Sequence, residues 1–217
     1  MTEKPLFPAG VLNLMMEEAF YKQLFLVLTL CFFAVRVYYD YRAGRQHLDK
    51  SLAVSVREQI TNEGLPSMVF RFVAFPVLII LVFGYPLTGW FDSLALPLPE
   101  VARFIGAILS ASSVPLLGWT QGTLGRYFSA GLEIQRDHRL ITSGPYGRIR
   151  HPMYTAIMMF GVGEALLSAN LLLLVLFVSA SMLLALRAPV EEKMLLKEFG
   201  DEYRDYMRRT GRFLPKI

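Results

Sequence analysis

The chain has 217 residues, of which 54% are hydrophobic and only 18% are charged, and its formal net charge is +4. Soluble domains average about 45–50% apolar and about 25% charged residues, so this composition excludes an ordinary soluble domain and indicates an integral membrane protein. The single cysteine, Cys31, excludes an internal disulfide and a metal site made of several thiolates. A basic balance is usual in membrane proteins, which keep Lys and Arg on the cytoplasmic side, so no nucleic-acid partner is expected.

Several apolar segments are long enough to cross a membrane. A bilayer core about 30 Å thick needs about 20 mainly apolar residues per helical crossing. The segments 20–39, 69–90 and 101–120 meet this requirement, and a longer apolar block follows at 153–186. Since Ser168 and Asn170 can cap helix ends, the sequence LSAN divides that block into two short antiparallel spans. The sequence therefore predicts an all-α membrane protein with about five transmembrane helices, the last two forming a helical hairpin.

The third predicted span repeats small residues every four positions, at Gly106, Ser110, Gly118 and Gly122. Such spacing lets neighbouring helices approach closely in lipid. Close helix packing explains these residues without any functional role.

The connections between the spans differ in charge. Lys and Arg gather in 40–67, in 121–152 and in the tail from 188, whereas 91–100 and the hairpin tip 168–170 contain none. Basic and non-basic connections thus alternate at every crossing, as the positive-inside tendency requires. The N-terminus lacks the pattern of a cleavable signal peptide. We expect a multi-pass protein with its N-terminus outside and both basic segments on the cytoplasmic face.

The tail after the hairpin has the pattern of amphipathic helices. Pro189 suits a first helical position, and Gly200 followed by Asp201 reads as a stop and a new N-cap. We expect two short amphipathic helices along the cytoplasmic surface.

Polar and aromatic residues crowd the start of the fourth predicted span, in the sequence HRLITSGPYGRIRHPMY. Because Pro152 suits the first position of a helix, His151 is expected at or next to the N-cap. Tyr154 follows on the same face, and the turn at Gly144–Pro145 aims Tyr146 back toward that end. A helix N-terminus of this kind attracts anionic groups such as a carboxylate.

Two further charged residues fall near membrane depth. Arg187 ends the fifth predicted span, and the hairpin returns it to the same surface as His151. An arginine there can simply snorkel to the interface, but ionisable residues at membrane depth are costly and point to a function. Glu164 lies about one turn from the hairpin tip, and we expect it to be exposed at the outer interface. No metal site is expected from three histidines and one cysteine.

Three sequence elements occur in order: RHPMY at 150–154, Arg187-x-x-x-Glu191-Glu192, and EFGDEYRDYM at 198–207. Together they resemble the isoprenylcysteine carboxyl methyltransferase family and its relatives among membrane phospholipid and thiol methyltransferases, over about residues 120–217. The resemblance implies transfer of a methyl group from S-adenosylmethionine to a substrate that enters from the membrane. It also implies a division into N-terminal spans, 1–120, and a cofactor loop, hairpin and amphipathic tail, 121–217, within a single membrane-embedded domain.

The resemblance assigns roles to particular residues of this chain. Arg187 would contact the substrate as the catalytic residue. A cofactor contact near Glu133 is left open, and Pro189 leaves open how Arg187 and Glu191 are oriented. The residues implied to bind the cofactor are His138, Arg139, Leu140, Ile141, Tyr146, His151, Pro152, Met153, Tyr154 and Glu191.

The expected partners are the lipid bilayer and a lipid-like or amphipathic methyl acceptor, such as the carboxylate of an isoprenylcysteine-type group. A carboxylate or thiolate acceptor is favoured, because it is already ionised and needs no base, while an amine would need one. Two alternatives stay open: an NADPH-dependent membrane reductase of sterol-reductase-like architecture, and a non-catalytic membrane scaffold. The identity of the acceptor and the oligomeric state are not readable from the sequence.

Overall fold

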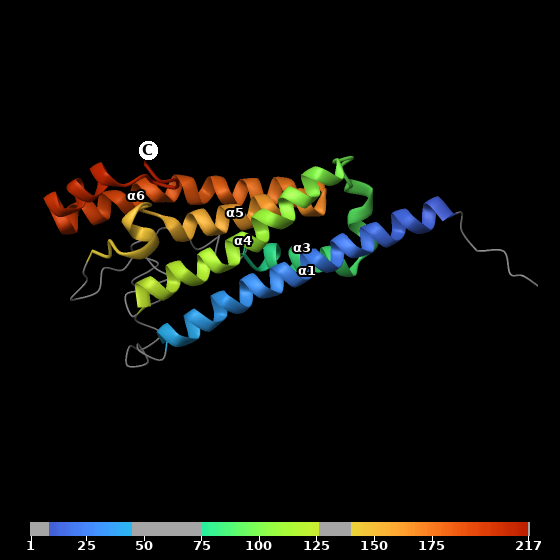
Figure 1. The fold of residues 1–217 in the computed structure, drawn as a ribbon, viewed down its shortest axis with the longest axis horizontal. Helices are drawn as coiled ribbons and strands as arrows, with labels where there is room; N and C mark the ends of the chain where they lie inside the picture. The colour runs from blue at the N-terminus through green and yellow to red at the C-terminus, as the bar shows by residue number, and fades with distance from the viewer. Residues whose placement is uncertain (1–8, 45–74, 126–139, 217) are drawn as a thin grey trace, which may run out of the picture.

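The structure is a computed structural model of the chain, and it describes residues 9–44, 75–125 and 140–216. All regular secondary structure in these ranges is helical, and no strand occurs among them, which confirms the predicted all-α class (Figure 1). The long helices are α1 (Ala9–Gly44), α3 (Phe75–Leu87), α4 (Glu100–Leu124), α5 (Pro152–Ser168) and α6 (Leu171–Arg209). Two short 3-10 turns, η2 (Gly89–Leu94) and η4 (Gly144–Gly147), lie between them.

Three of these helices are long and apolar enough to cross a membrane: α1 over Met16–Arg42, α4 and α6. Among the described residues, α3 has only 13 residues and α5 only 17. The first part of the predicted span 69–90 lies outside the described residues. The membrane character is therefore confirmed, and the count of five crossings stays a prediction.

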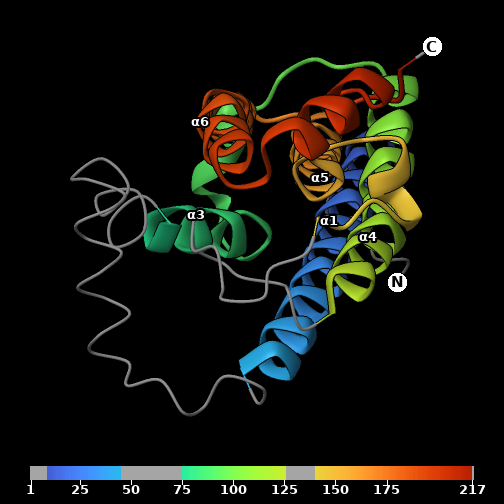
Figure 2. The ribbon, with the colours of Figure 1, turned by 90° about the vertical axis from the view of Figure 1, so that its left-hand side faces the viewer.

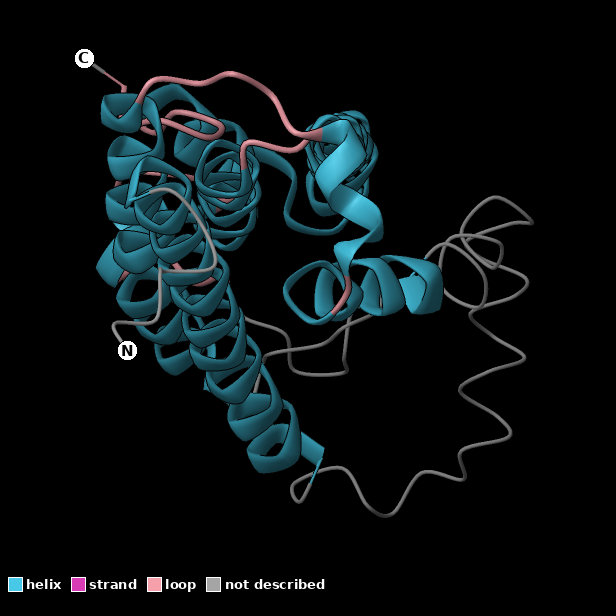
Figure 3. Cartoon of the chain, turned by 90° about the vertical axis from the view of Figure 1, so that its right-hand side faces the viewer, coloured by secondary structure: helices cyan, strands magenta, loops and turns pink. Residues whose placement is uncertain are grey.

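Helix α4 packs against both α5 and α1 and lies between them in Figure 1, and Figure 2 shows it at the edge of the bundle away from α3 and α6. Helix α6 packs on α5 as the second arm of the hairpin, and α3 lies apart from α4, near α1 and beneath α6 (Figure 3). A buried apolar core joins the first and last parts of the chain, since Phe32 of α1 stacks on Phe160 of α5 with ring centroids 4.0 Å apart. This arrangement brings the start of α5 and the charged half of α6 to the same end of the bundle.

The closest helix contact is between α4 and α5, where two glycines face each other. A Cβ atom on Gly106 would lie 2.7 Å from the carbonyl oxygen of Gly163, and one on Gly163 would lie 2.5 Å from the backbone nitrogen of Ser110. Gly106 and Gly163 permit this approach because neither carries a Cβ atom, and the small Ser110 leaves room for the backbone of Gly163. The predicted packing role of the small residues Gly106 and Ser110 is thus confirmed.

The hairpin between α5 and α6 turns where the sequence predicts. Ala169 adopts a left-handed conformation with φ 46°, and Asn170 is the N-cap of α6, where its side chain accepts hydrogen bonds from the backbone nitrogens of Leu172 and Leu173. The connection before α4 covers this tip, because the Asn170 amide donates to the carbonyl of Phe91 at 2.7 Å. The tip is therefore buried.

The expectation that Glu164 is exposed is wrong. Its exposed fraction is 0%, and one carboxyl oxygen accepts a hydrogen bond from the Ser110 hydroxyl of α4. Two features account for this burial: the covered hairpin tip and the close approach of α4 and α5. Glu164 therefore belongs to the helix interface.

The first of the two predicted amphipathic helices is also not separate. Helix α6 runs on through Pro189 with helical backbone angles, although the proline has no N–H for the carbonyl of Ala185 and its ring crowds that carbonyl. The predicted break at Gly200 is confirmed, since Gly200 has φ 54° and ψ −122° inside the run. The charged residues after Arg187 thus continue the same helix as the apolar span.

Candidate active site

The start of α5 is fixed by the loop that precedes it. His151 is the N-cap of α5 and Pro152 occupies the first turn, as predicted. Gly144 has φ 57°, and η4 packs so closely on α4 that a Cβ atom on Gly144 would lie 2.8 Å from the Thr123 hydroxyl. Tyr146 is buried, and its carbonyl accepts a hydrogen bond of 2.7 Å from the Tyr206 hydroxyl. The loop therefore presents His151 and Tyr146 in defined positions.

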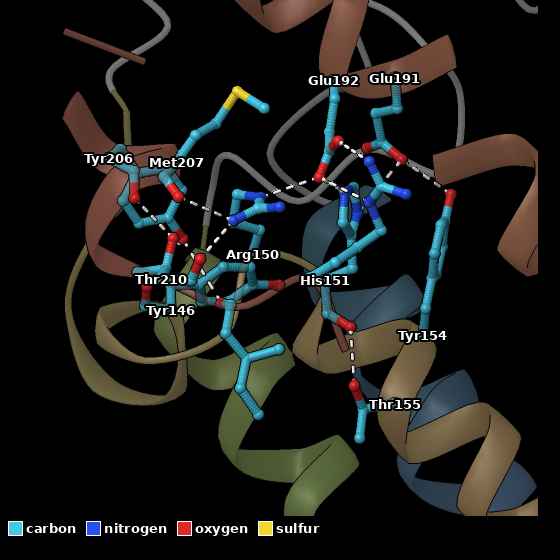
Figure 4. Close-up of polar contacts among 12 residues, drawn as sticks. Tyr146, Arg150, His151, Tyr154, Thr155, Glu191, Glu192, Tyr206, Met207 and Thr210 are labelled. Carbon is cyan, nitrogen blue, oxygen red and sulfur yellow. Dashed lines mark hydrogen bonds and ion pairs between the residues drawn. The ribbon is translucent and has the colours of Figure 1, made fainter. Parts of the chain in front are cut away.

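Side chains from α5 and α6 meet at this end of the bundle (Figure 4). The His151 and Tyr154 rings lie nearly parallel, with centroids 5.3 Å apart. The Tyr154 hydroxyl donates to Glu191 at 2.8 Å, and the same carboxylate oxygen lies 3.8 Å from His151 Nδ1. Arg187 is close enough to act electrostatically on the Tyr154 hydroxyl. Arg187 and Glu191 thus reach the same tyrosine, although Pro189 lies between them.

Tyr146 completes the aromatic side of this cluster. Burial is the main reason that the pKa of Tyr146 lies far above its usual value, and the nearby Glu191 carboxylate raises it further. The tyrosine therefore stays a neutral phenol at physiological pH. Neutral aromatic faces beside carboxylates favour a ligand with a cationic centre.

A second set of contacts surrounds Glu192, one residue further along α6. This buried carboxylate accepts hydrogen bonds from Arg150 at 2.8 Å and from Arg212 at 2.6 and 3.1 Å (Figure 4 shows Glu192 and Arg150). His151 Nε2 lies 3.4 Å from the same carboxylate without meeting hydrogen-bond geometry. The hydrogen bonds to Glu192 raise the pKa of Arg212 above its usual value.

The remaining predicted site residues are less closely joined to this cluster. Leu140 and Ile141 are partly buried just before η4. Met153 points toward α1, where its sulfur accepts from an Arg36 nitrogen at 3.6 Å. His138, Arg139 and Glu133 lie outside the described residues. The structure thus brings together Tyr146, His151, Tyr154, Arg187 and Glu191, with Pro152 beneath His151.

The sequence reasoning missed Glu192, Arg150 and Arg212. The adjacent pair Glu191-Glu192 was visible, but only the first member stands four residues after Arg187. No sequence pattern near Arg212 indicated a role in the site, because it reaches Glu192 only through the turn of the chain after α6. Among the residues that the structure describes, no three His, Cys, Asp or Glu side chains gather as a metal site.

Replacing Tyr154 with phenylalanine tests the contact between α5 and Glu191. The ring remains and only the hydroxyl that donates to Glu191 is lost. We expect a modest loss of ligand binding at this site, about three- to tenfold, because the lost hydrogen bond acts on the ligand only through Glu191 and so less than its full ~1.5–3 kcal/mol reaches the affinity. Calorimetry with S-adenosylhomocysteine measures it, and Tyr203→Phe is the control, since the Tyr203 hydroxyl makes no hydrogen bond within the described residues. An unchanged affinity for Tyr154→Phe would contradict the predicted contribution of this hydroxyl.

Comparisons with known proteins confirm the resemblance stated from the sequence. Residues 106–197 match the isoprenylcysteine carboxyl methyltransferase (ICMT) family. The matched range contains Tyr146, His151, Tyr154, Arg187 and Glu191, and it ends before the Gly200 break. Arg212 lies outside it.

Curated relatives fall into two groups. The nickel-cobalt-cadmium resistance protein NccN of Alcaligenes xylosoxydans xylosoxydans is 30% identical over 69% of this chain and 64% of that protein. Protein-S-isoprenylcysteine O-methyltransferases of Tribolium castaneum and Arabidopsis thaliana (form B) are 34% and 33% identical over 44% of this chain. The chain spans 35% of the first and 50% of the second of these enzymes.

Among solved structures, that of a eukaryotic intramembrane Ras methyltransferase, ICMT, is 27% identical in sequence to this chain. The match covers 70% of this chain and 53% of that chain, with a TM-score of 0.48.

Proposed function

We propose that this chain, which matches the isoprenylcysteine carboxyl methyltransferase family over residues 106–197, is a membrane-embedded methyltransferase that uses S-adenosylmethionine. Its acceptor would be a lipid-like or amphipathic molecule, with the carboxylate of an isoprenylcysteine-type group as the favoured class. The observation that carries the proposal is the convergence of His151, Tyr154, Glu191 and Arg187 at the boundary between apolar and charged parts of the hairpin.

The residues present fit S-adenosylmethionine, which carries a sulfonium, an amino group and a carboxylate. The His151 ring is stacked on Tyr154 with Nδ1 3.8 Å from Glu191, so this edge of the imidazole lies beside the carboxylate offered to the ligand, while Nε2 faces Glu192. Tyr146 and Tyr154 offer neutral aromatic faces to a cation, and Glu191 offers a carboxylate to an amino or ribose group. Leu140, Ile141, Pro152 and Met153 would line the same site, together with His138 and Arg139 of the undescribed loop.

When bound, S-adenosylmethionine supplies a methyl group on a positively charged sulfur. The protein's own contribution is to hold the acceptor in line with that methyl group, since orientation alone can supply most of the rate in such a displacement. Arg187 would bind the acceptor carboxylate through two parallel N–H donors. A carboxylate is ionised at neutral pH, so no side chain has to remove a proton.

The membrane setting supports an amphipathic acceptor. Arg187 follows directly on the apolar part of α6, so a lipid-soluble tail can stay in the bilayer while its acidic head reaches the cluster. We infer from the alternation of basic and non-basic connections that the N-terminus is outside and that this site and the C-terminus face the cytoplasm.

Binding of the cofactor to detergent-purified protein is the first test. Calorimetry with S-adenosylmethionine, S-adenosylhomocysteine and NADPH should give micromolar binding of the first two and none of NADPH. His151→Ala should weaken the binding at least about tenfold, since it removes a charge-assisted or neutral hydrogen bond and one stacked ring. His47→Ala is the matched control, because His47 is not among the residues implied to bind the cofactor.

Binding of NADPH alone would move the chain to the reductase alternative. Binding of none of the three would contradict the proposal and favour a non-catalytic scaffold.

A further inference from the structure

We propose that Glu192 is a positioning residue of the cofactor site that fixes the place of the His151 ring. The C-terminal turn at Thr210–Phe213 would contribute to the same positioning through Arg212. The inference rests on the proposed function, because it assumes that His151 contacts the cofactor. It goes beyond the proposed function by assigning a role to Glu192, which is not among the predicted site residues (Figure 4), and to Arg212, which lies outside the family match.

The first step is the charge balance around Glu192. Its side chain is only 5% exposed, and it is bound by two guanidinium groups, those of Arg150 and Arg212. A carboxylate accepts at about four lone-pair positions, and the two arginines occupy three of them. Oε1 accepts from both arginines and is also the oxygen that lies 3.4 Å from His151 Nε2, so the arginines hold this oxygen beside the imidazole. The arginines therefore keep Glu192 ionised and turned toward the imidazole.

The second step is the confinement of the His151 ring. One face lies against Tyr154, and the Phe213 ring is 6.0 Å away on another side. The ring edge has a carboxylate near each nitrogen, Glu191 at 3.8 Å from Nδ1 and Glu192 at 3.4 Å from Nε2. Of these two acids, Glu191 also accepts from Tyr154, whereas Glu192 is anchored by arginines. Of the two carboxylates beside the imidazole, that of Glu192 is thus held more rigidly.

The third step is the backbone of the C-terminal turn. The His151 N–H donates to the carbonyl of Arg212 at 3.0 Å, and the Arg150 N–H donates to that of Gly211 at 2.8 Å. Further along α5, the Thr155 hydroxyl donates to the carbonyl of Phe213 at 2.7 Å. The same turn that supplies Arg212 to Glu192 therefore also fixes the backbone that carries His151.

A role of Glu192 in positioning His151 can be distinguished from a role in the stability of the fold alone. If Glu192 only held the fold together, its loss would lower the melting temperature but leave the affinity of folded protein unchanged. If it sets the position of His151, the affinity for the cofactor product falls even far below the melting temperature. The environment of the His151 nitrogens changes as well.

The experiment compares Glu192→Gln with Glu192→Asp, which keeps the charge, and with Glu202→Gln, an exposed acid on the same helix. S-adenosylhomocysteine affinity is measured by calorimetry at a temperature well below each melting point. The ¹⁵N signals of the histidine rings are recorded in parallel, with the His151 signal identified from a His151→Asn variant. We expect Glu192→Gln to raise the Kd at least about tenfold and to shift the His151 signal, which corresponds to the loss of one charge-assisted contact. Glu192→Asp should lie between wild type and Glu192→Gln, and Glu202→Gln should match wild type.

A second variant keeps the test decisive if Glu192→Gln does not fold. Arg212→Gln removes the two-pronged contact from a half-exposed side chain, and it should raise the Kd about threefold. If the wild-type protein binds S-adenosylhomocysteine, and neither variant changes the Kd or the His151 signal, the positioning role is wrong while the proposed function stands. Failure of the wild-type protein to bind S-adenosylhomocysteine overturns the proposed function, and the positioning role falls with it.

Discussion

Replacing Arg187 with glutamine should lower kcat by about a hundredfold while leaving the affinity for S-adenosylhomocysteine within about twofold of wild type. The reason is geometric, because a misplaced acceptor can cost about 10²-fold in rate. Glutamine cannot offer the two parallel, charged N–H donors that hold a carboxylate in line. The measurement follows the transfer of labelled methyl groups to a small S-prenylated cysteine with a free carboxylate, in detergent or lipid.

Two further variants test whether this effect is specific to the guanidinium group of Arg187. Arg187→Lys keeps the charge but loses the planar fork, so its rate should fall between those of wild type and Arg187→Gln. Arg204→Gln, an exposed arginine on the same helix paired with Asp201, should behave like wild type. If Arg187→Gln instead weakened S-adenosylhomocysteine binding as strongly as His151→Ala, Arg187 would be a cofactor residue and its assigned role would be wrong.

Local sequence signals predicted the elements that carry the site. Pro152 placed the start of α5 and made His151 its N-cap, and Asn170 placed the turn between α5 and α6. Both residues act through backbone groups within a few positions, so their effect can be read without knowledge of the fold. The approach of Tyr154 to Glu191 followed from the hairpin itself.

The failed predictions depend on contacts between distant segments. Glu164 is buried because the connection at 91–96 covers the hairpin tip, which no pattern near Glu164 reveals. Arg212 reaches Glu192 only because the chain turns back after α6. Pro189 suits the first position of a new helix, yet α6 runs through it from the apolar span before it. The roles of the individual site residues, and the division at residue 120, remain predictions.

The tight contact between α4 and α5 gives the second large expected effect, this time on stability. Gly163→Ala should destabilise the protein by about 1–3 kcal/mol, since the added Cβ atom would meet the backbone of Ser110 at 2.5 Å and that of Gly106 at 2.7 Å. Backbone atoms cannot move aside as a flexible side chain can, so the two helices must separate. That separation also loosens the hydrogen bond between Ser110 and Glu164, and it leaves a buried carboxyl group without its partner.

The matched control is Gly118→Ala on α4, where the new Cβ atom would meet only the Val35 side chain at an ordinary 3.7 Å. Alanine is a better helix former than glycine by about 0.5–1 kcal/mol, so Gly118→Ala should raise the melting temperature of detergent-purified protein while Gly163→Ala lowers it. Opposite signs from the same chemical change would tie the effect to the helix contact rather than to helix propensity. A melting temperature for Gly163→Ala equal to or above that of wild type would mean that α4 and α5 are further apart than described.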